Sequence, residues 1–360
     1  MDNQVNAPKI LKESKNKITV DFERTSLKER LKLKYLNVSY IATLLWRFFR
    51  FLLLLGVSYV ILYPFFSKIT ASFMSAEDFV DVTVKLIPKH PTIDTYKAII
   101  VDLNYVQALF NSTLVALVSA VLQTFICCVI GYGFAKFKFK GSKILFACVL
   151  LTMIVPHSTI QLALSNKFRF FDVFGVIKLL GGGVVPSLDI IPSADGGIFV
   201  NGTSLDLRNT LWPLVLMSIG GIAFKNGLYI YMMRQFFKGV PDELEESAYI
   251  DGYGIFKTFF LIVIPLSVPM MITIFLFAFS WQWTDEFYTA LFFPGGNKML
   301  MLPHLVGKVT KLDTSGAGQS LYEAAIQNTI GLMIIAPLLV VYLFCQRYLV
   351  EGIERSGLVG

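Results

Sequence analysis

The sequence predicts an all-α, polytopic membrane protein with six transmembrane helices, and three observations support this fold class. Of the 360 residues, 55% are hydrophobic and only 16% are charged, whereas a soluble domain carries about 25% charged residues. The apolar stretches are long and continuous, without the alternation of a half-buried strand. Six of them are long enough to cross the hydrocarbon core of a bilayer, which takes about 20 residues of helix.

The six predicted spans are residues 44–66, 106–135, 144–166, 211–233, 258–283 and 324–345. The second span contains no charge, whereas Lys225 interrupts the fourth. All four tryptophans lie near predicted span ends, where amphipathic rings prefer the membrane interface. We therefore expect a basic N-terminal segment at 1–43, a six-span membrane domain at 44–350 and a short tail at 351–360.

The positive residues predict the orientation. Lysines and arginines are frequent before the first span, and the loop at 135–143 contains four lysines and no acid. Since such loops stay on the cytoplasmic side, both termini and the loop at 234–257 are predicted to be cytoplasmic. An unusually long segment at about 167–210 is then extracellular, either as a functional loop or as a plain spacer.

Composition also excludes several classes of function. The net charge is +7. The positive residues lie beside apolar spans, which favours contact with membrane lipids over contact with nucleic acid. Cys127, Cys128, Cys148 and Cys345 lie inside apolar runs without zinc-ligand spacing. No nucleophile motif, paired catalytic carboxylates or nucleotide-binding P-loop is recognisable in the sequence. We expect no enzyme activity and no cofactor bound by this chain.

The loop at 234–257 contains a short, well-delimited helix. Pro241 suits a first-turn position, and the acids that follow it favour the positive end of the helix dipole. Gly252 can supply the left-handed residue that ends a helix. Leu244 and Ala248 are one turn apart and share a face with Ser247. This surface predicts a docking element for another protein, with a solvated helix face as the alternative.

At this loop the sequence resembles the permease subunits of binding-protein-dependent ABC importers. Their signature reads Glu-Ala-Ala, three residues, Gly, nine residues, Ile, one residue and Leu-Pro. The chain keeps every spacing, with Glu246-Ser247-Ala248, Gly252, Ile262 and Ile264-Pro265. Ser247 replaces Ala and Ile264 replaces Leu. The resemblance implies the type I ABC importer permease fold and an importer driven by separate ATPase subunits.

Further segments are similar to the carbohydrate branch of this family, the maltose-type inner permease, over roughly residues 40–360. They are Asn111-Ser112-Thr113, the segment 131–141, Met153-Ile154-Val155-Pro156, the segment 233–237, Trp283-Thr284-Asp285-Glu286-Phe287 and the segment 346–352. The region near 170–207 departs from the family's pattern and looks like an insertion. We expect this insertion to contact the binding protein.

The resemblance implies a set of partners. They are a second related permease, two ATP-binding subunits that hold ATP and Mg²⁺, an extracellular solute-binding protein and a sugar or oligosaccharide. It also implies that the ATPase subunits act through residues of the loop and the following span. These are Glu243, Leu244, Glu245, Glu246, Ser247, Ala248, Asp251, Gly252 and Pro265, with Glu246 the preferred ionic contact.

A second set of residues is expected at the substrate pathway or against the binding protein. It consists of Trp281, Trp283, Phe287, Tyr288 and Lys225. An aromatic belt at the membrane interface is the alternative for the rings, and snorkelling to the interface is the alternative for Lys225. In the maltose type the partner permease holds most sugar contacts. We expect the lone His157 to be a packing residue.

Two other functions remain open at this stage. The same machine can carry phosphate, a peptide or an amino acid instead of a sugar. A secondary transporter driven by an ion gradient would need carboxylates within the membrane, and the predicted spans contain none before Asp285 at the outer edge. The resemblance implies a permease of the bacterial cell membrane.

Overall fold

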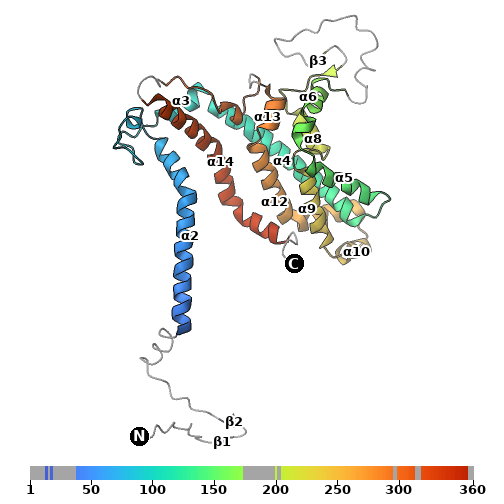
Figure 1. Cartoon of the computed structure of the whole chain (residues 1–360). Helices are drawn as coiled ribbons and strands as arrows, with labels where there is room; N and C mark the ends of the chain where they lie inside the picture. Colours follow the sequence, from blue (N-terminus) through green and yellow to red (C-terminus); the bar gives the residue numbers. More distant parts are fainter. Residues whose placement is uncertain are drawn as a thin grey trace, which may run out of the picture. The chain divides into compact units, whose positions relative to one another are not determined.

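The computed structural model in Figure 1 describes residues 38–172, 204–294, 298–312 and 318–355, with two-residue strands at 13–14, 17–18 and 199–200. Most of the predicted N-terminal segment 1–43 lies outside the described residues. The same holds for most of the predicted insertion at 167–210 and for residues 356–360 of the predicted tail. Chain contacts divide the protein into two units, Met1–Ser67 and Lys68–Gly360.

The first unit contains β1 (Glu13–Ser14), which pairs antiparallel with β2 (Lys17–Ile18), and most of helix α2 (Val38–Ala71). Near the start of the predicted first span, the ring of Trp46 stacks on Phe49 with centroids 5.6 Å apart. The guanidinium of Arg50 lies 6.0 Å from the centre of the Trp46 ring. This grouping of aromatic and basic side chains is typical of a helix end at a membrane interface.

The second unit is predominantly helical. Its elements are η1 (Glu77–Phe79), α3 (Asp94–Asp102), α4 (Tyr105–Lys136), α5 (Ser142–Ile154), η2 (His157–Ile160), α6 (Gln161–Arg169), β3 (Phe199–Val200), β4 (Ser204–Leu205), α8 (Trp212–Ile219), α9 (Asn226–Lys238), α10 (Glu243–Ile250), α11 (Ile255–Thr258), the π-helical η3 (Phe259–Val263), α12 (Ile264–Trp283), α13 (Phe287–Phe292), η5 (Leu302–Leu305) and α14 (Gln319–Arg355).

Among the described residues, four helices are long and apolar enough to cross a membrane. They are Ala42–Ala71, Tyr105–Lys136, Ile255–Trp283 and Gln319–Val350. The third predicted span is bent by 97° between α5 and the η2–α6 segment, and it adds a fifth crossing if the pair counts as one span. The predicted count of six is therefore not confirmed, because the fourth predicted span, 211–233, is no single helix. It divides into α8 and α9.

The breaks have local causes. Pro156 has no N–H to donate and forces Val155 into an extended conformation (ψ 119°), which ends α5. Between α8 and α9, Gly221 and Lys225 both have positive φ, at 70° and 67°. An apolar run alone does not reveal such breaks, because hydropathy reports burial or lipid contact rather than helix continuity.

The core of the second unit lies where α4, α9 and α12 pack against one another, as Figure 1 shows. Tyr229, Met233 and Met270 are fully buried there. A Cβ atom added at Gly131 would lie 2.5 Å from Cβ of Met233. The missing side chain of Gly131 thus lets α4 approach α9 closely, as small residues do in membrane helix packing.

Candidate functional site

Helix α10 forms within the loop where the sequence predicts it, and its end is well defined. The C=O of Asp242 accepts hydrogen bonds from the N–H groups of Glu245 and Glu246, both at 3.0 Å. At the other end, Gly252 has φ +82°. Its N–H donates to Tyr249, and the N–H of Tyr253 donates to Ala248 at 2.9 Å. This is the paired hydrogen-bond pattern of a glycine-terminated helix, as the sequence predicts for Gly252.

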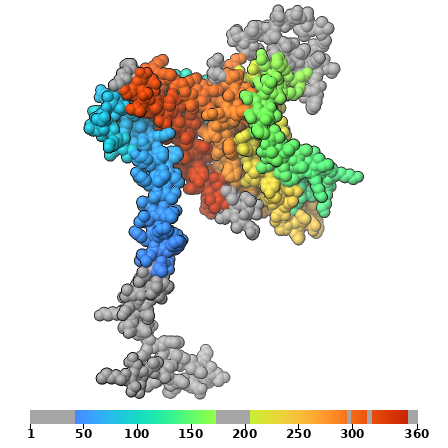
Figure 2. Space-filling model, in the orientation of Figure 1, coloured from blue at the N-terminus to red at the C-terminus, as the bar shows by residue number. Residues whose placement is uncertain are grey.

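The predicted coupling residues divide between two faces of α10. Glu245 and Ala248 are buried against the rest of the unit, with exposed fractions of 8% and 2%. Within residues 243–252, the exposed residues are Glu243, Leu244, Glu246, Ser247, Tyr249, Ile250, Asp251 and Gly252. Figure 2 shows the yellow segment that includes α10 at the surface of the second unit. A partner can therefore reach acidic and apolar groups on the outer face, but not Ala248.

A cluster of polar contacts holds the inner face of α10 to helix α4. The hydroxyl of Tyr132 donates to Oε2 of Glu245 at 2.8 Å. Nζ of Lys136 donates to the C=O of Val240 at 2.7 Å and to Oδ1 of Asp242 at 2.5 Å. The same ammonium lies 3.5 Å from Oε1 of Glu245. We call Tyr132, Lys136, Asp242 and Glu245 the anchor cluster.

The anchor cluster fixes charges as well as positions. The hydrogen bond from Lys136 lowers the pKa of Asp242, because it favours the charged carboxylate. Sequence reasoning missed Tyr132 and Lys136 as functional residues. A signal was present, since both lie in the segment 131–141 that resembles the family's turn out of the second span.

Pro265 lies apart from this surface, at the beginning of α12 and directly after the π-helical segment η3. Phe259 of η3 packs against the ring of Tyr132 with centroids 5.0 Å apart. Helix α10 thus connects through α11 and η3 to a long membrane helix whose first turns are irregular. π-Helical turns and prolines are common places for a helix to bend.

The second predicted set of residues gathers only in part. Trp281 and Tyr288 both lie beside Phe224, with ring centroids 5.4 and 6.1 Å away. The ammonium of Lys225 lies 4.9 Å from the Trp281 ring and 4.8 Å from the Phe224 ring. Phe224 is therefore a central residue of this cluster, and sequence reasoning did not single it out.

Trp283 and Phe287 do not share this position. Trp283 is buried, and its Nε1 donates to the C=O of Ile334 in α14 at 2.9 Å, so its ring joins α12 to α14. Phe287 is half-buried and stacks edge-on against Tyr288. The hydroxyl of Tyr288 and Nδ1 of His157 are hydrogen-bonded at 2.8 Å, so His157 is a partnered side chain in this structure.

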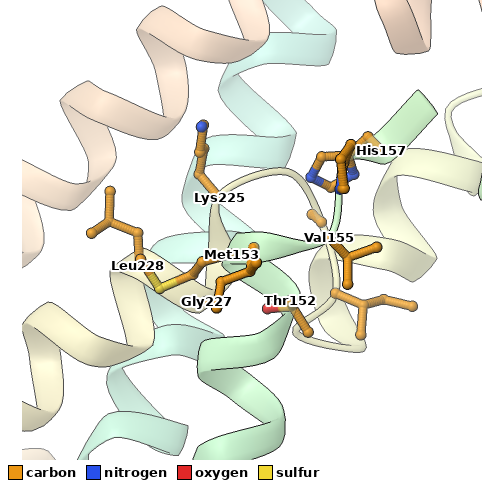
Figure 3. A pocket seen from close by; sticks show the side chains of 11 residues that line it. Thr152, Met153, Val155, His157, Lys225, Gly227 and Leu228 are labelled. Atoms are coloured by element: carbon orange, nitrogen blue, oxygen red, sulfur yellow. The ribbon is translucent and has the colours of Figure 1, made fainter. Parts of the chain in front are cut away.

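A cavity of about 240 Å³ lies between the two helix breaks. Residues 152–157, around the bend after α5, line one side, and residues of 222–228, around the break before α9, line the other. Figure 3 shows Lys225 rising from the connection before α9 and His157 standing across the cavity from it. Close packing supports this arrangement, because a Cβ at Gly227 would lie 2.6 Å from Oγ1 of Thr152.

Known proteins resemble the chain over most of its length. It is 27% identical over 315 residues to the galactooligosaccharides transport system permease protein GanQ of Bacillus subtilis (strain 168), covering 87% of this chain and 95% of that protein. It is 26% identical over 315 residues to the polygalacturonan/rhamnogalacturonan transport system permease protein YtcP of the same organism, covering 85% and 96%.

A solved structure shares the fold. It is a chain of a bacterial ABC transporter involved in the import of the acidic polysaccharide alginate, with a TM-score of 0.60 and 18% identity over 91% of this chain and 99% of that one. The sequence profile of the family described as "Binding-protein-dependent transport system inner membrane component" matches residues 128–355. The chain therefore belongs to this family of membrane-embedded transport permeases, which are not enzymes.

Proposed function

We propose that the chain is the permease subunit of an ABC importer that carries a sugar or oligosaccharide across the bacterial cell membrane. The observation that carries the proposal is helix α10, whose acidic and apolar outer face is exposed while its inner face is held to α4 by the anchor cluster. Such a surface suits a partner that pushes or pulls on the helix. The sugar class rests on the similarity to carbohydrate permeases of related sequence.

The energy is expected to come from two partner ATPase subunits, which bind ATP and Mg²⁺. Their docking surface on this chain is the outer face of α10, with Glu246 as the preferred ionic contact and Leu244 as an apolar one. Movement of α10 would pass to α4 through Lys136 and Tyr132. Alternating access would then follow as a switch between two packings of the membrane helices.

The remaining partners are a second related permease and an extracellular solute-binding protein. Both termini and the loop at 234–257 are proposed to be cytoplasmic, with α8 and α9 together forming one interrupted crossing. Trp281, Tyr288 and Lys225 are proposed to lie at the substrate pathway. Trp283 is better explained by packing against α14.

Purification from native membranes tests this function. We expect the tagged chain, in mild detergent, to bring with it a second permease and an ATP-binding subunit, identified by mass spectrometry. The purified complex, reconstituted in liposomes with the binding protein, should accumulate labelled oligosaccharide only with ATP inside. Isolation of the chain alone, with sugar flux driven by an ion gradient, would show a secondary transporter instead.

A further inference from the structure

A small pocket, which we call the polar notch, lies where helices α4 and α12, the break before α9 and the start of α13 meet. Its lining includes Gln123, Phe224, Trp281, Gln282, Asp285 and Tyr288. The notch has a volume of about 10 Å³, which is room for one group the size of a water molecule. It shares no lining residue with the cavity beside Lys225, so it is a separate feature of the fold.

Two side chains that line the polar notch carry buried atoms without hydrogen-bond partners. Gln123 is 3% exposed, and its Oε1 has no partner among the described residues. Nε2 of Gln282 is also buried and has no partner in the same part of the chain. Buried polar groups usually have partners, because an unpaired one keeps its full cost of desolvation. The notch therefore presents one unused acceptor from α4 and one unused donor from α12.

The combination of an acceptor with a donor indicates which kind of group the notch can bind. A hydroxyl both donates and accepts, so it can satisfy Oε1 of Gln123 and Nε2 of Gln282 together. A carboxylate could only accept, and it would approach the carboxylate of Asp285. A metal cation or an ammonium group offers no acceptor for Nε2 of Gln282. The ammonium of Lys225 also lies 4.9 Å from the centre of the Trp281 ring and would repel a second cation. The notch thus suits one neutral O–H group.

The surroundings of the notch favour a hydroxyl carried by a sugar over an enclosed water molecule. Trp281 lines the notch but is 46% exposed, so this chain covers only about half of its side chain. Aromatic surfaces beside a few well-placed polar groups are typical of small-molecule sites. The face of a sugar ring can lie on Trp281 while one of its hydroxyls enters the notch. Asp285 is held in place, because its Oδ2 accepts a hydrogen bond from the N–H of Thr289 at 3.0 Å.

We propose that Gln123 and Gln282 form a hydroxyl subsite in the transport pathway. One hydroxyl of the passing sugar donates to Oε1 of Gln123 and accepts from Nε2 of Gln282. The inference rests on the proposed function and adds two specificity-determining residues to it, whichever sugar is carried. A site built around a hydroxyl rejects an analogue that lacks this hydroxyl, because the buried polar groups of the site are then left unpaired. A water molecule in the notch would make the same hydrogen bonds without distinguishing one sugar from another.

Uptake by cells that contain the complete transporter tests the subsite, with the protein and the sugar altered in turn. Labelled maltose, cellobiose, galactobiose and mannobiose are used to find an accepted disaccharide, and its single-deoxy analogues each lack one hydroxyl. We expect the unaltered protein to take up one analogue more slowly than the parent sugar by roughly tenfold or more. Gln123→Met removes the acceptor but keeps a side chain of similar length, and Gln282→Met removes the donor.

In both variants, uptake of the parent sugar per transporter in the membrane should fall, and the ratio of parent to analogue uptake should fall by roughly tenfold or more. Any preference of the binding protein is the same for every variant and cancels from this comparison. If one variant does not reach the membrane, the other gives the same ratio. Gln107→Met, which alters an exposed glutamine on the same helix α4, is the matched control and should leave the ratio unchanged.

The outcomes separate the inference from the proposed function. An unchanged ratio for every analogue in both variants would overturn the hydroxyl subsite and leave a sugar importer intact. Such a result with normal uptake would assign the notch to an ordered water molecule, and with equal loss of uptake for all sugars it would show a structural role for the two glutamines. Uptake of none of the four disaccharides by the unaltered, assembled transporter would contradict the proposed function together with the subsite.

Discussion

At the scale of single residues, Lys136 of α4 contacts both α10 and the turn that precedes it. Its ammonium joins a backbone carbonyl and two carboxylates. The side chains of Lys136 and Glu245 are only 9% and 11% exposed. Removing one partner of such a pair is costly, because the other charge stays desolvated and uncompensated. Substitutions that remove a charge from the anchor cluster should therefore destabilise the protein more than substitutions that only shorten a side chain.

We expect Lys136→Met to destabilise the detergent-solubilised protein by about 3 kcal/mol, the order found when a buried ion pair loses one partner. Adding Glu245→Gln should restore part of this loss, because the amide oxygen can still accept the Tyr132 hydroxyl without an unpaired charge. The measurement is the thermal unfolding midpoint, with Lys140→Met as the exposed control. Equal loss in the single and double variants would mean that charge pairing does not stabilise the cluster.

At the scale of helices, Gly131 sets how closely α4 and α9 approach, while Gly133 on the same helix faces open space, with nothing within 4 Å of an added Cβ. The two glycines are thus a matched pair for testing the packing of the core. Overpacking a tight contact costs roughly 1–3 kcal/mol.

Gly131→Ala should accordingly lower the thermal midpoint and the amount of protein in the membrane, whereas Gly133→Ala should leave both unchanged or slightly raised, since alanine favours helix more than glycine does. Thermal unfolding of the two purified variants tests this expected difference in midpoint. A destabilised Gly133→Ala beside a normal Gly131→Ala would contradict the close approach.

The helical scale is also where prediction from the sequence reached its limit. Helix α10 and its Gly252 ending followed from local rules, because Pro, acidic residues and Gly act within one or two turns. The division of the fourth predicted span did not, although Gly220-Gly221 and Lys225 were visible in it. Tyr132, Lys136 and Phe224 acquire their roles from partners about 60 to 110 residues away in the chain, and no local pattern contains that information.

At the scale of the whole molecule, the account depends on which face of α10 meets another protein. The membrane helices can form a transport permease of the matched family, but they carry no recognisable ATP-binding motif of their own. In the proposed function, the energy for transport enters at a contact surface with the ATP-binding subunits. Ser247, Leu244 and Glu246 are exposed there, while Ala248 and Glu245 are turned inward.

Cysteine crosslinking at Ser247 tests this claim most directly. Cys148 and Cys345 are the accessible natural cysteines among the described residues, and both are first replaced by Ser. Ser247→Cys is then introduced. The assembled transporter in membranes is treated with a short bis-maleimide. We predict a crosslink to a cysteine on the ATP-binding subunit that changes in yield when ATP is added. The docking role of α10 would be contradicted if Ser247→Cys gave no crosslink to that subunit and a bulky maleimide attached to this cysteine left ATP-driven uptake unchanged.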